Sequence, residues 1–565
     1  SRRRDGGYRV CGKNVGHWNP GGLKHLFRQM QIVGLSTGAH DISYAILKDG
    51  IVEYHAELER HTRIKECSGD AVKYLLENED LSDVKYVCNF IGRWRGGIQT
   101  RYPESWQKLQ DTLKETGGEY VEVGHHKAHA ANAFFSSPYD ESLIITIDGG
   151  GDCDGTGEVR TTCVTAWVGK DNRIAHLCTL PMECNPGVFW SNFTKQVFGL
   201  STGPPMGNQC GTVMGMAALG DKSKYAEKIY SHPSFFQMHG FPFNEYAEIA
   251  KENEQAQFDI AAGLQDATET ACHKIFNDIS DLVGNKYTNL CLAGGVALNS
   301  VMTGKIPEWM PEMKGIYIPP VPYDAGLAIG TAQYVYHHTL NHARVDHGDY
   351  FSPYLGAKYS KADVLKALKE RGGMAWVTAN DDDVVKLLTE KNVVSVYGGR
   401  SESGRRALGN RSILADPRFD DMKDIVNERV KHRQWFRPFA PSVMAEDVKD
   451  WFEQDLPSPY MSFVSKFKED KLKKVPAVVH FDSTARTQTV TAKGNPWYHG
   501  IISKFKEITG VPMLLNTSFN DREPIVETPA DAVNCFLKTN IDYLYFYEYG
   551  ILVEKHEHVE KESEL

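Results

Sequence analysis

Glycine-rich corners that follow apolar segments restrict the fold of this chain more than any other feature. Residues 142–152 (SLIITIDGGGD) are apolar and β-branched, and they finish on an acid and three glycines. Residues 289–300 (NLCLAGGVALNS) have the pattern of a buried strand, a Gly-Gly corner and a helix start. Residues 31–50 have that of two strands joined by a turn at Ser36–His40. Because glycine has no Cβ, backbone N–H groups at such corners can approach phosphates. The pattern predicts an α/β nucleotide-binding unit.

Three such corners in this order are the general layout of the actin/hexokinase-type ATPase fold, in which two related halves close over a nucleotide. The chain turns polar at 339–358, where we expect a linker. An amphipathic helix pattern (KADVLKALKERGG) and further α/β pattern follow it. We therefore predict two domains, at 30–345 and 355–565. Residues 1–29 are Arg/Gly-rich without a period, and we expect a tag or another non-native leader there, ahead of Met30.

Composition argues against several classes of protein. The 565 residues carry a formal net charge of -10, which disfavours a nucleic-acid polymer as partner, because phosphate backbones favour a basic footprint. No uninterrupted apolar run is long enough to span a bilayer, so we expect no membrane association. The 11 cysteines are an odd number without a CxxC pair, which suits reduced thiols. We therefore expect a cytoplasmic enzyme.

A metal centre is the first of two predicted sites. His125 and His129 are four residues apart in an Ala-rich helix, so both imidazoles project from one face. Asp148 ends an apolar strand and Asp324 precedes a helix, positions at which ligands of α/β folds collect. Two imidazoles and two carboxylates suit Fe²⁺, Mn²⁺ or Zn²⁺. The alternative is structural: half-buried histidines, a turn-forming Asp148 and an N-capping Asp324.

The second predicted site is a basic cluster. Arginine's planar fork binds phosphate bidentately and lysine adds a point charge, so the cluster could hold ATP and a second phosphate. A solvated basic face that contacts RNA is the alternative, although the prolines and apolar residues around Arg437 (WFRPFAPS) argue against free solvation. The cluster comprises Arg405, Arg406, Arg411, Arg418, Lys431, Arg433 and Arg437, with Arg486 in an expected strand and Ser518 and Asn520 after another.

With these motifs in place, the chain resembles the O-carbamoyltransferase family of nodulation-factor and antibiotic biosynthesis, from about Met30 to about residue 550. The segments that carry the resemblance are GHHKAHA (124–130), IDGGGD (147–152), VMGMAALG (213–220), LAGGVALNS (292–300), YDAGLAIG (323–330), RRALGNRSILADPR (405–418), VKHRQWFRPFAPSV (430–443), TARTQTV (484–490) and LLNTSFN (514–520).

The resemblance implies an N-terminal domain similar to the tRNA threonylcarbamoyl transferase and a YrdC-like α/β C-terminal domain. The C-terminal domain would convert carbamoyl phosphate and ATP, with Mg²⁺, to carbamoyl-adenylate and pyrophosphate. The N-terminal domain would pass the carbamoyl group to a hydroxyl of a small-molecule acceptor. A homodimer is in keeping with the family. The alternative function is a fused tRNA threonylcarbamoyl-type transferase and synthase, which would start from threonine, bicarbonate and ATP.

The family's site residues can be carried onto this chain. The resemblance implies a metal, Fe²⁺ first, at His125, His129, Asp148 and Asp324. The positions that would hold ATP and carbamoyl phosphate are Arg406, Lys431, Arg437, Arg486, Ser518 and Asn520, with Arg437 counted as catalytic. The nucleotide-contacting corners match Gly149, Gly150, Gly294, Gly295 and Asn299.

Two further residues, His40 and Lys65, match segments that line the acceptor side and are expected to be catalytic. His40, near its ordinary pKa, could take the proton of the acceptor hydroxyl. Its alternative role is that of a turn histidine that caps the backbone.

The chain also departs from the family pattern. Thr212 stands where the family often has a lysine, and AALG replaces APYG at 217–220. HFDSTAR replaces VDGTAR at 480–486, and GAHD lacks an acid two residues before His40. These positions border the acceptor or nucleotide corners. The departures therefore bear on which acceptor is used, and the expected reaction stays the same.

Overall fold

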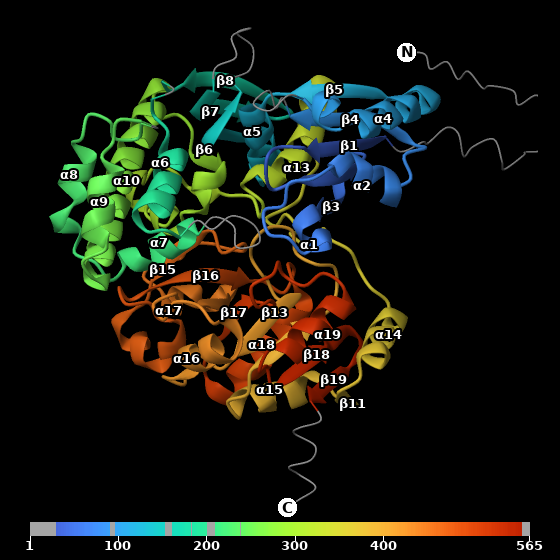
Figure 1. Ribbon diagram of the computed structural model, residues 1–565, viewed down its shortest axis with the longest axis vertical. Coiled ribbons are helices and arrows are strands. Elements are labelled where there is room, and N and C mark those ends of the chain that lie inside the picture. Colours follow the sequence, from blue (N-terminus) through green and yellow to red (C-terminus); the bar gives the residue numbers. More distant parts are fainter. Residues whose placement is uncertain are drawn as a thin grey trace, which may run out of the picture.

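The computed structural model describes residues 30–90, 97–152, 161–181, 183–200, 209–237 and 239–555 (Figure 1). The described residues form a mixed α/β structure with two five-stranded sheets and one nine-stranded sheet. The expected leader at residues 1–29 lies outside the described residues. Nowhere in the described ranges is a helix both long and apolar enough to cross a membrane.

The two five-stranded sheets repeat one topology. The first sheet, in the order β3-β2-β1-β4-β5, consists of β1 (Gln31–Ser36), β2 (Ser43–Lys48), β3 (Ile51–Glu57), β4 (Val84–Phe90) and β5 (Glu119–Val123). The second, in the order β10-β9-β6-β7-β8, consists of β6 (Glu141–Asp152), β7 (Thr161–Lys170), β8 (Arg173–Thr179), β9 (Asn289–Ala293) and β10 (Gly315–Tyr317). In each, the first three strands are antiparallel and the last two run parallel to the first.

The strands expected within 31–50, 142–152, 163–169 and 289–293 are confirmed. One detail differs, because Asp148 does not end its strand. The pairing of β6 with β7 shifts between Ile147 and Gly151, and the strand then continues to Asp152. The glycines after Asp148 allow this irregularity, since glycine adopts backbone conformations that other residues rarely reach.

Three backbone segments pack unusually closely at the centre of the N-terminal part: β1, α13 (Leu327–Gln333) and α5 (His125–Phe135) (Figure 1). A Cβ on Gly330 would lie 1.9 Å from the carbonyl oxygen of Ala128 in α5. A Cβ on Gly34 of β1 would lie 1.7 Å from the carbonyl oxygen of Ala328 in α13. Glycine at these two positions therefore sets the distance between α5, which carries His125 and His129, and the elements behind it.

The remaining N-terminal helices cover the sheets, and aromatic rings such as Phe189, Phe193 and Phe241 fill the space beside α10 with edge-to-face and tilted contacts. These helices are α1 (Leu58–Thr62), α2 (Ala71–Asn78), α3 (Ile98–Arg101), α4 (Pro103–Thr116), α6 (Pro186–Asn192), α7 (Cys210–Ala217), α8 (Ala226–Tyr230), α9 (Phe243–Ala250), α10 (Glu254–Leu282), α11 (Ser300–Thr303) and α12 (Ile306–Trp309).

The C-terminal sheet is mixed, in the order β11-β19-β18-β12-β13-β17-β14-β16-β15. Its strands are β11 (Met374–Thr378), β12 (Val394–Tyr397), β13 (Arg411–Ala415), β14 (Ala440–Met444), β15 (Phe463–Lys466), β16 (Thr484–Val490), β17 (Met513–Ser518), β18 (Tyr543–Phe546) and β19 (Ile551–Lys555). Its helices are α14 (Lys361–Arg371), α15 (Asp381–Thr389), α16 (Met422–Val426), α17 (Val448–Trp451), α18 (Pro496–Thr509) and α19 (Pro529–Lys538). Between Thr339 and Lys361 the chain forms neither helix nor strand.

Replacing Gly330 with alanine should destabilise the protein, because the added Cβ would meet the Ala128 carbonyl oxygen at 1.9 Å. Overpacking of this kind lowers the free energy of unfolding by about 1–3 kcal/mol. The matched control is Gly500→Ala in α18, where a Cβ meets nothing within 4 Å and helix propensity should add about 0.5–1 kcal/mol. Urea denaturation measures both variants, and equal stability would contradict the close approach of α5 and α13.

Candidate active site

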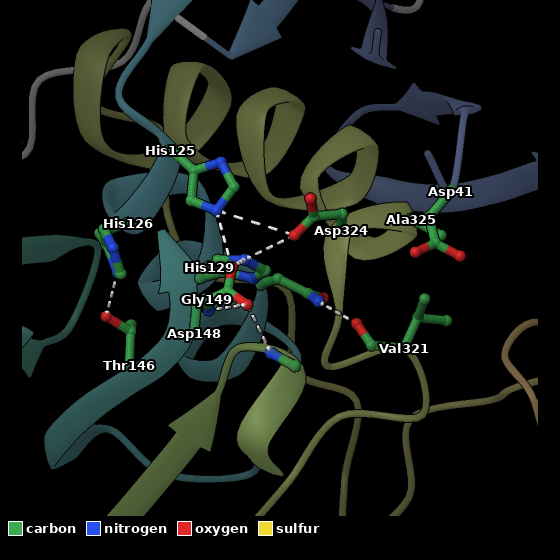
Figure 2. A network of polar contacts seen from close by, with 12 residues as sticks. Asp41, His125, His126, His129, Thr146, Asp148, Gly149, Val321, Asp324 and Ala325 are labelled. Atoms are coloured by element: carbon green, nitrogen blue, oxygen red, sulfur yellow. Dashed lines mark hydrogen bonds and ion pairs between the residues drawn. The ribbon is translucent and has the colours of Figure 1, made fainter. Parts of the chain in front are cut away.

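Four side chains converge in the N-terminal part (Figure 2). α5 presents His125 and His129, β6 supplies Asp148, and the 3-10 helix η5 (Asp324–Gly326) supplies Asp324. Nε2 of His125 lies 2.9 Å from Asp148 Oδ2, and Nε2 of His129 lies 3.2 Å from the same atom. Asp324 Oδ1 lies 3.7 Å and 3.4 Å from these two nitrogens. The structure thus brings together the four residues that the sequence indicated as metal ligands.

The four groups fit a divalent metal ion. One ligand atom from each residue lies within 4.8 Å of the others. Atoms about 2.0–2.2 Å from a single ion are roughly 3–3.6 Å apart, which is close to the observed separations. Burial by itself would lower the pKa of His129, but hydrogen bonds with Asp148 and Asp324 outweigh it and raise the pKa to about 9. A cation can take the place of the proton that these carboxylates hold on the imidazole.

The other oxygen of Asp148 is held by the glycine corners. Oδ1 accepts hydrogen bonds from the backbone N–H groups of Gly149 (2.8 Å) and Gly295 (3.1 Å). Gly294 has φ 99°, and a Cβ there would lie 2.0 Å from the carbonyl oxygen of Ile147, so only glycine permits this approach. The expectation that corner amides are free to meet phosphates is therefore wrong for Gly149 and Gly295, whose amides orient a carboxylate.

His126 points away from the cluster and attaches α5 to the sheet (Figure 2). Its Nε2 donates to the carbonyl of Thr162 and its Nδ1 accepts from the hydroxyl of Thr146, both at 2.7 Å. Burial lowers the pKa of His126 to about 3, so the ring is neutral. The residue between the two ligand positions therefore holds the helix in place.

One continuous cavity of about 1390 Å³ joins this cluster to a basic centre, which consists of Lys431, Arg406, Arg433, Arg437 and Arg486. Asp148 and Asp324 lie on its wall, together with His40 and Lys65. The predicted phosphate-binding residues on the same wall are Arg406, Lys431, Arg437, Arg486, Ser518 and Asn520. Of the predicted corner residues, the wall includes Gly149, Gly295 and Asn299 but not Gly150 or Gly294.

Lys431 is enclosed by the two polar residues predicted to share its site. Its Nζ donates to the carbonyl (2.5 Å) and hydroxyl (3.2 Å) oxygens of Ser518. It also donates to the carbonyl (2.8 Å) and Oδ1 (2.6 Å) oxygens of Asn520. Burial lowers the pKa of Lys431 well below its usual range. This oxygen cage fixes the position of the amine at the end of β17.

Four arginines complete the basic centre: Arg406, Arg433, Arg437 and Arg486. In the part of the chain that the structure describes, none of the four is paired with an acid. Burial lowers the pKa of Arg406 and that of Arg437 to about 10. Burial and neighbouring guanidinium groups lower the pKa of Arg433 and that of Arg486 well below the usual range. Buried positive charge without a partner is costly, so this wall suits a polyanion.

His40, between β1 and β2, is paired with an acid. Its Nδ1 donates to Asp41 Oδ2 at 2.7 Å, and this hydrogen bond raises the pKa of His40 to about 10. Burial opposes ionisation of Asp41, but Arg405 and His40 lower its pKa to about 2. The expectation of an ordinary pKa for His40 is therefore wrong, and the ring is protonated at neutral pH. Burial lowers the pKa of Lys65, against the opposing effect of Glu59.

Several wall residues were given no role from the sequence, although two of them adjoin residues that were. Asp41 follows His40, and Glu66 follows Lys65. Another group, Gln265, Glu269 and Lys305, joins the predicted residue Asn299 in a connected polar patch by hydrogen bonds and an ion pair. Conversely, two arginines of the basic cluster, Arg411 and Arg418, are not on the wall, because one lies 3.7 Å over the Tyr397 ring and the other pairs with Asp416.

Comparison with known proteins places two family descriptions on this chain. Carbamoyltransferase N-terminus matches residues 98–333, and Carbamoyltransferase C-terminus matches residues 385–554. Nodulation protein NolNO of Sinorhizobium fredii is 33% identical and covers 91% of this chain and 79% of its own length. Nodulation protein NolO of Bradyrhizobium diazoefficiens is 35% identical and covers 75% and 77%. An uncharacterised Synechocystis protein, sll1178, is 32% identical over a match that covers 91% of this chain and 95% of the Synechocystis protein.

Among solved structures, HypF of T. kodakarensis has a TM-score of 0.37 at 14% identity, covering 55% of this chain and 48% of its own. The (R)-2-hydroxyglutaryl-CoA dehydratase component A of Acidaminococcus fermentans has a TM-score of 0.33 at 16% identity, covering 54% and 98%. These TM-scores are too low to assign a shared fold.

Binding of Mn²⁺ or Fe²⁺ to the cluster should tighten as pH rises. His129 has a pKa of about 9 in the metal-free protein, so below that pH the cation must displace a proton. The dissociation constant, measured calorimetrically under anaerobic conditions, should fall about tenfold per pH unit up to that value. Asp148→Asn should weaken binding at least about tenfold, whereas Asp278→Asn, on exposed α10 surface, should not. A pH-independent affinity, or binding that survives in Asp148→Asn, would argue against this cluster.

Proposed function

This chain belongs to the carbamoyltransferase family, and we propose that it is an ATP-dependent O-carbamoyltransferase. It would activate carbamoyl phosphate as carbamoyl-adenylate and pass the carbamoyl group to a hydroxyl of a small molecule. The main support is the single cavity that borders unpaired cations at one end and the His/Asp cluster at the other. Two successive reactions that share an unstable intermediate need two different centres within reach of each other.

We assign these centres to domains at 30–345 and 355–565. The doubled five-strand topology supports an actin/hexokinase-type ATPase fold for the first domain, in which two like halves frame a nucleotide. The basic centre on the mixed nine-stranded sheet supports a YrdC-like, adenylate-forming role for the second. Both proposed substrates suit a cytoplasmic enzyme.

In the first half-reaction, the basic centre handles phosphate groups. Atom balance requires that carbamoyl phosphate lose orthophosphate to water, which leaves a carbamate oxygen. That oxygen attacks the α-phosphorus of ATP and displaces pyrophosphate. Arg406 and Arg437 can neutralise charge on the phosphates during this exchange, and caged Lys431 adds a third positioned group. ATP would enter as its Mg²⁺ complex.

In the second half-reaction, the acceptor hydroxyl attacks the carbamoyl carbon, and the bond from that carbon to the AMP phosphate oxygen breaks. His40 enters this step protonated, so it can donate a hydrogen bond to the carbonyl oxygen as negative charge develops there. This replaces the general-base role inferred from the sequence. Lys65 lines the same end of the cavity, and burial lowers its pKa, which suits it to accept the hydroxyl proton.

The metal cluster fits the same scheme. His125, His129, Asp148 and Asp324 would hold Fe²⁺, with Mn²⁺ or Zn²⁺ as the alternatives that this donor set allows. When bound, such an ion supplies a Lewis acid for a carbonyl or phosphoryl oxygen. The oxygen of Asp148 that faces the histidines is oriented for this purpose by the two amides on its other side.

The acceptor is a hydroxyl compound whose class the family departures help to set. Thr212, Ala217 and Ala218, at which the chain departs from the family pattern, lie on the cavity wall. So do His480 and Asp482, which belong to the departure at 480–486. A panel of chitotetraose, kanamycin and 5-hydroxymethyldeoxyuridine monophosphate, incubated with ATP, Mg²⁺ and carbamoyl phosphate, tests three acceptor classes. A mass increase of one carbamoyl group identifies the product.

Isotope labels separate the proposal from a threonylcarbamoyl-type activity. Carbamoyl-labelled carbamoyl phosphate should enter an adenylate, whereas labelled threonine with bicarbonate should not. Label from threonine in the adenylate would favour the fused transferase and synthase, and label from neither source would contradict both.

Arg437→Ala should lower ATP–pyrophosphate exchange that depends on carbamoyl phosphate by about a hundredfold or more, because it removes one cation from the phosphate site. Arg418→Ala is the matched control, since Arg418 lies off the cavity wall and pairs with Asp416. Exchange that is unchanged in Arg437→Ala, or equally reduced in both variants, would contradict the assignment.

His40→Asn should retain the exchange reaction while transfer to the acceptor falls by about a hundredfold. Because the protonated ring is the active form in this proposal, wild-type transfer should decline as pH rises through about 10, the pKa of His40. Deprotonation of Lys65, the proposed base, also raises the rate with pH, so only the decline tests His40: a decline near pH 10 that persists unchanged in His40→Asn would contradict this role. The measurement is the pH profile of carbamoylated product, with exchange followed in parallel.

A further inference from the structure

The segment between β12 and β13 is a rigid loop that leaves the C-terminal part. Glu402 closes its base, because one carboxylate oxygen accepts backbone hydrogen bonds from Leu408 (2.7 Å), Asn410 (2.9 Å) and Arg411 (3.1 Å). Three amides on a single oxygen fix the path of the chain across the loop. The fixed backbone therefore sets where the side chains at the tip of the loop begin and in which direction they extend.

The tip of this loop is anchored in the N-terminal part. The N–H of Gly404 donates to Glu57 Oε1 at 2.5 Å, and the carbonyl of Gly404 accepts from Arg60 at 2.8 Å. The second oxygen of Glu57 accepts from the Tyr323 hydroxyl at 2.6 Å. Gly404 has φ 101°, a conformation that favours glycine. Both peptide groups at the tip are thus bound to residues of the other part.

The side chains of Arg405 and Arg406, which follow Gly404, lie in different sites. One guanidinium nitrogen of Arg405 lies 2.8 Å and 3.0 Å from the two oxygens of Asp41, and the other lies 2.8 Å from Glu66. Its guanidinium carbon sits 4.5 Å from the centre of the Tyr323 ring, beside Asp324 in sequence. Arg406, in contrast, belongs to the unpaired cations of the basic centre.

We propose that Arg405 is a positioning residue of the transfer centre that the adenylate-forming domain supplies. It holds the Asp41 carboxylate, which in turn holds the His40 ring. The transfer centre is then complete only when the loop is docked, and this inference rests on the proposed function. Arg405 and Arg406 are consecutive on this loop, so one fixed backbone segment places both the side chain that borders the phosphate site and the side chain that holds Asp41.

The geometry favours this role over that of a surface ion pair. Asp41 has only 5% of its side-chain surface exposed, and its two oxygens are both within hydrogen-bond distance of Arg405. Exposed pairs contribute little, whereas a buried carboxylate held at both oxygens has one orientation. The hydrogen bond to His40 is made by one of these same oxygens. Removal of Arg405 would free Asp41 to rotate and would release the ring.

The test compares two half-reactions in the full-length chain. Arg405→Gln should keep carbamoyl-phosphate-dependent exchange within about twofold of wild type, while transfer to the best acceptor of the panel falls at least about twentyfold. AMP released per carbamoylated product should rise, because the adenylate still forms and then reacts with water. Arg405→Lys should restore part of the transfer, since one ammonium can reach one carboxylate.

Arg63→Gln is the matched control. Arg63 also crosses between the two parts and has similar side-chain exposure, 26% against 29% for Arg405, but it donates to the carbonyl oxygens of Pro524 and Ile525. It should leave the ratio of AMP to product unchanged. Equal loss of both half-reactions in Arg405→Gln, without rescue by lysine, would reduce the residue to a structural role. Undiminished transfer would overturn the inference.

A second variant covers the case in which Arg405→Gln folds poorly. Asp41→Asn removes the partner carboxylate from the N-terminal side and should give the same separation of exchange from transfer. The double variant should be no worse than the more damaging single one, because both changes break one interaction. Additive losses would overturn the inference. A wild-type enzyme without exchange or product would instead refute the proposed function itself.

Discussion

The N-terminal site depends on the contacts of the Asp148 carboxylate. One oxygen lies against the imidazoles of His125 and His129, and the other accepts the amides of Gly149 and Gly295. The side chain thereby connects α5, β6 and the corner after β9. Burial of a carboxylate raises the free energy of the folded state unless all its partners are in place. The carboxylate therefore requires α5, β6 and the corner after β9 to be in place at the same time. The irregularity in β6 and the glycine corners follow from that requirement.

The cavity wall carries both the unpaired arginines and, with His40 and Lys65, two carboxylates of the His/Asp cluster, and the charge of the proposed ligands suits the arginines. ATP and carbamoyl phosphate together carry many negative charges, which suit the unpaired arginines. The adenylate carries only one phosphate charge, so the basic centre holds it less tightly than it holds the substrates. A protonated His40 and a metal-binding cluster at the other end can attract that remaining charge.

The sequence predicted features that are local in the chain. The four-residue spacing of His125 and His129 on a helix, and the strand that carries Asp148, needed no knowledge of distant contacts. The order of the glycine corners indicated two related halves, but the strand order within each sheet was not predicted, because it depends on pairings between distant segments. The pKa of His40 was missed because it depends on a hydrogen bond with Asp41 and on the charges of Asp324 and Glu66, whose positions around the ring only the fold determines. Likewise, no pattern indicates that a carboxylate would take up the corner amides.

Several contacts between the two parts are made to the main chain, and those at Gly404 fix the loop that carries the tandem arginines. Arg60 donates to the carbonyl of Gly404, just before the tandem arginines. Arg63 donates to the carbonyls of Pro524 and Ile525, just after the residues that cage Lys431. A bond to a carbonyl fixes the backbone itself, so every side chain on that loop is placed at the same time. The contacts of Gly404 therefore place the tandem arginines against the N-terminal part, and the proposed transfer centre does not have its full geometry within one part of the chain.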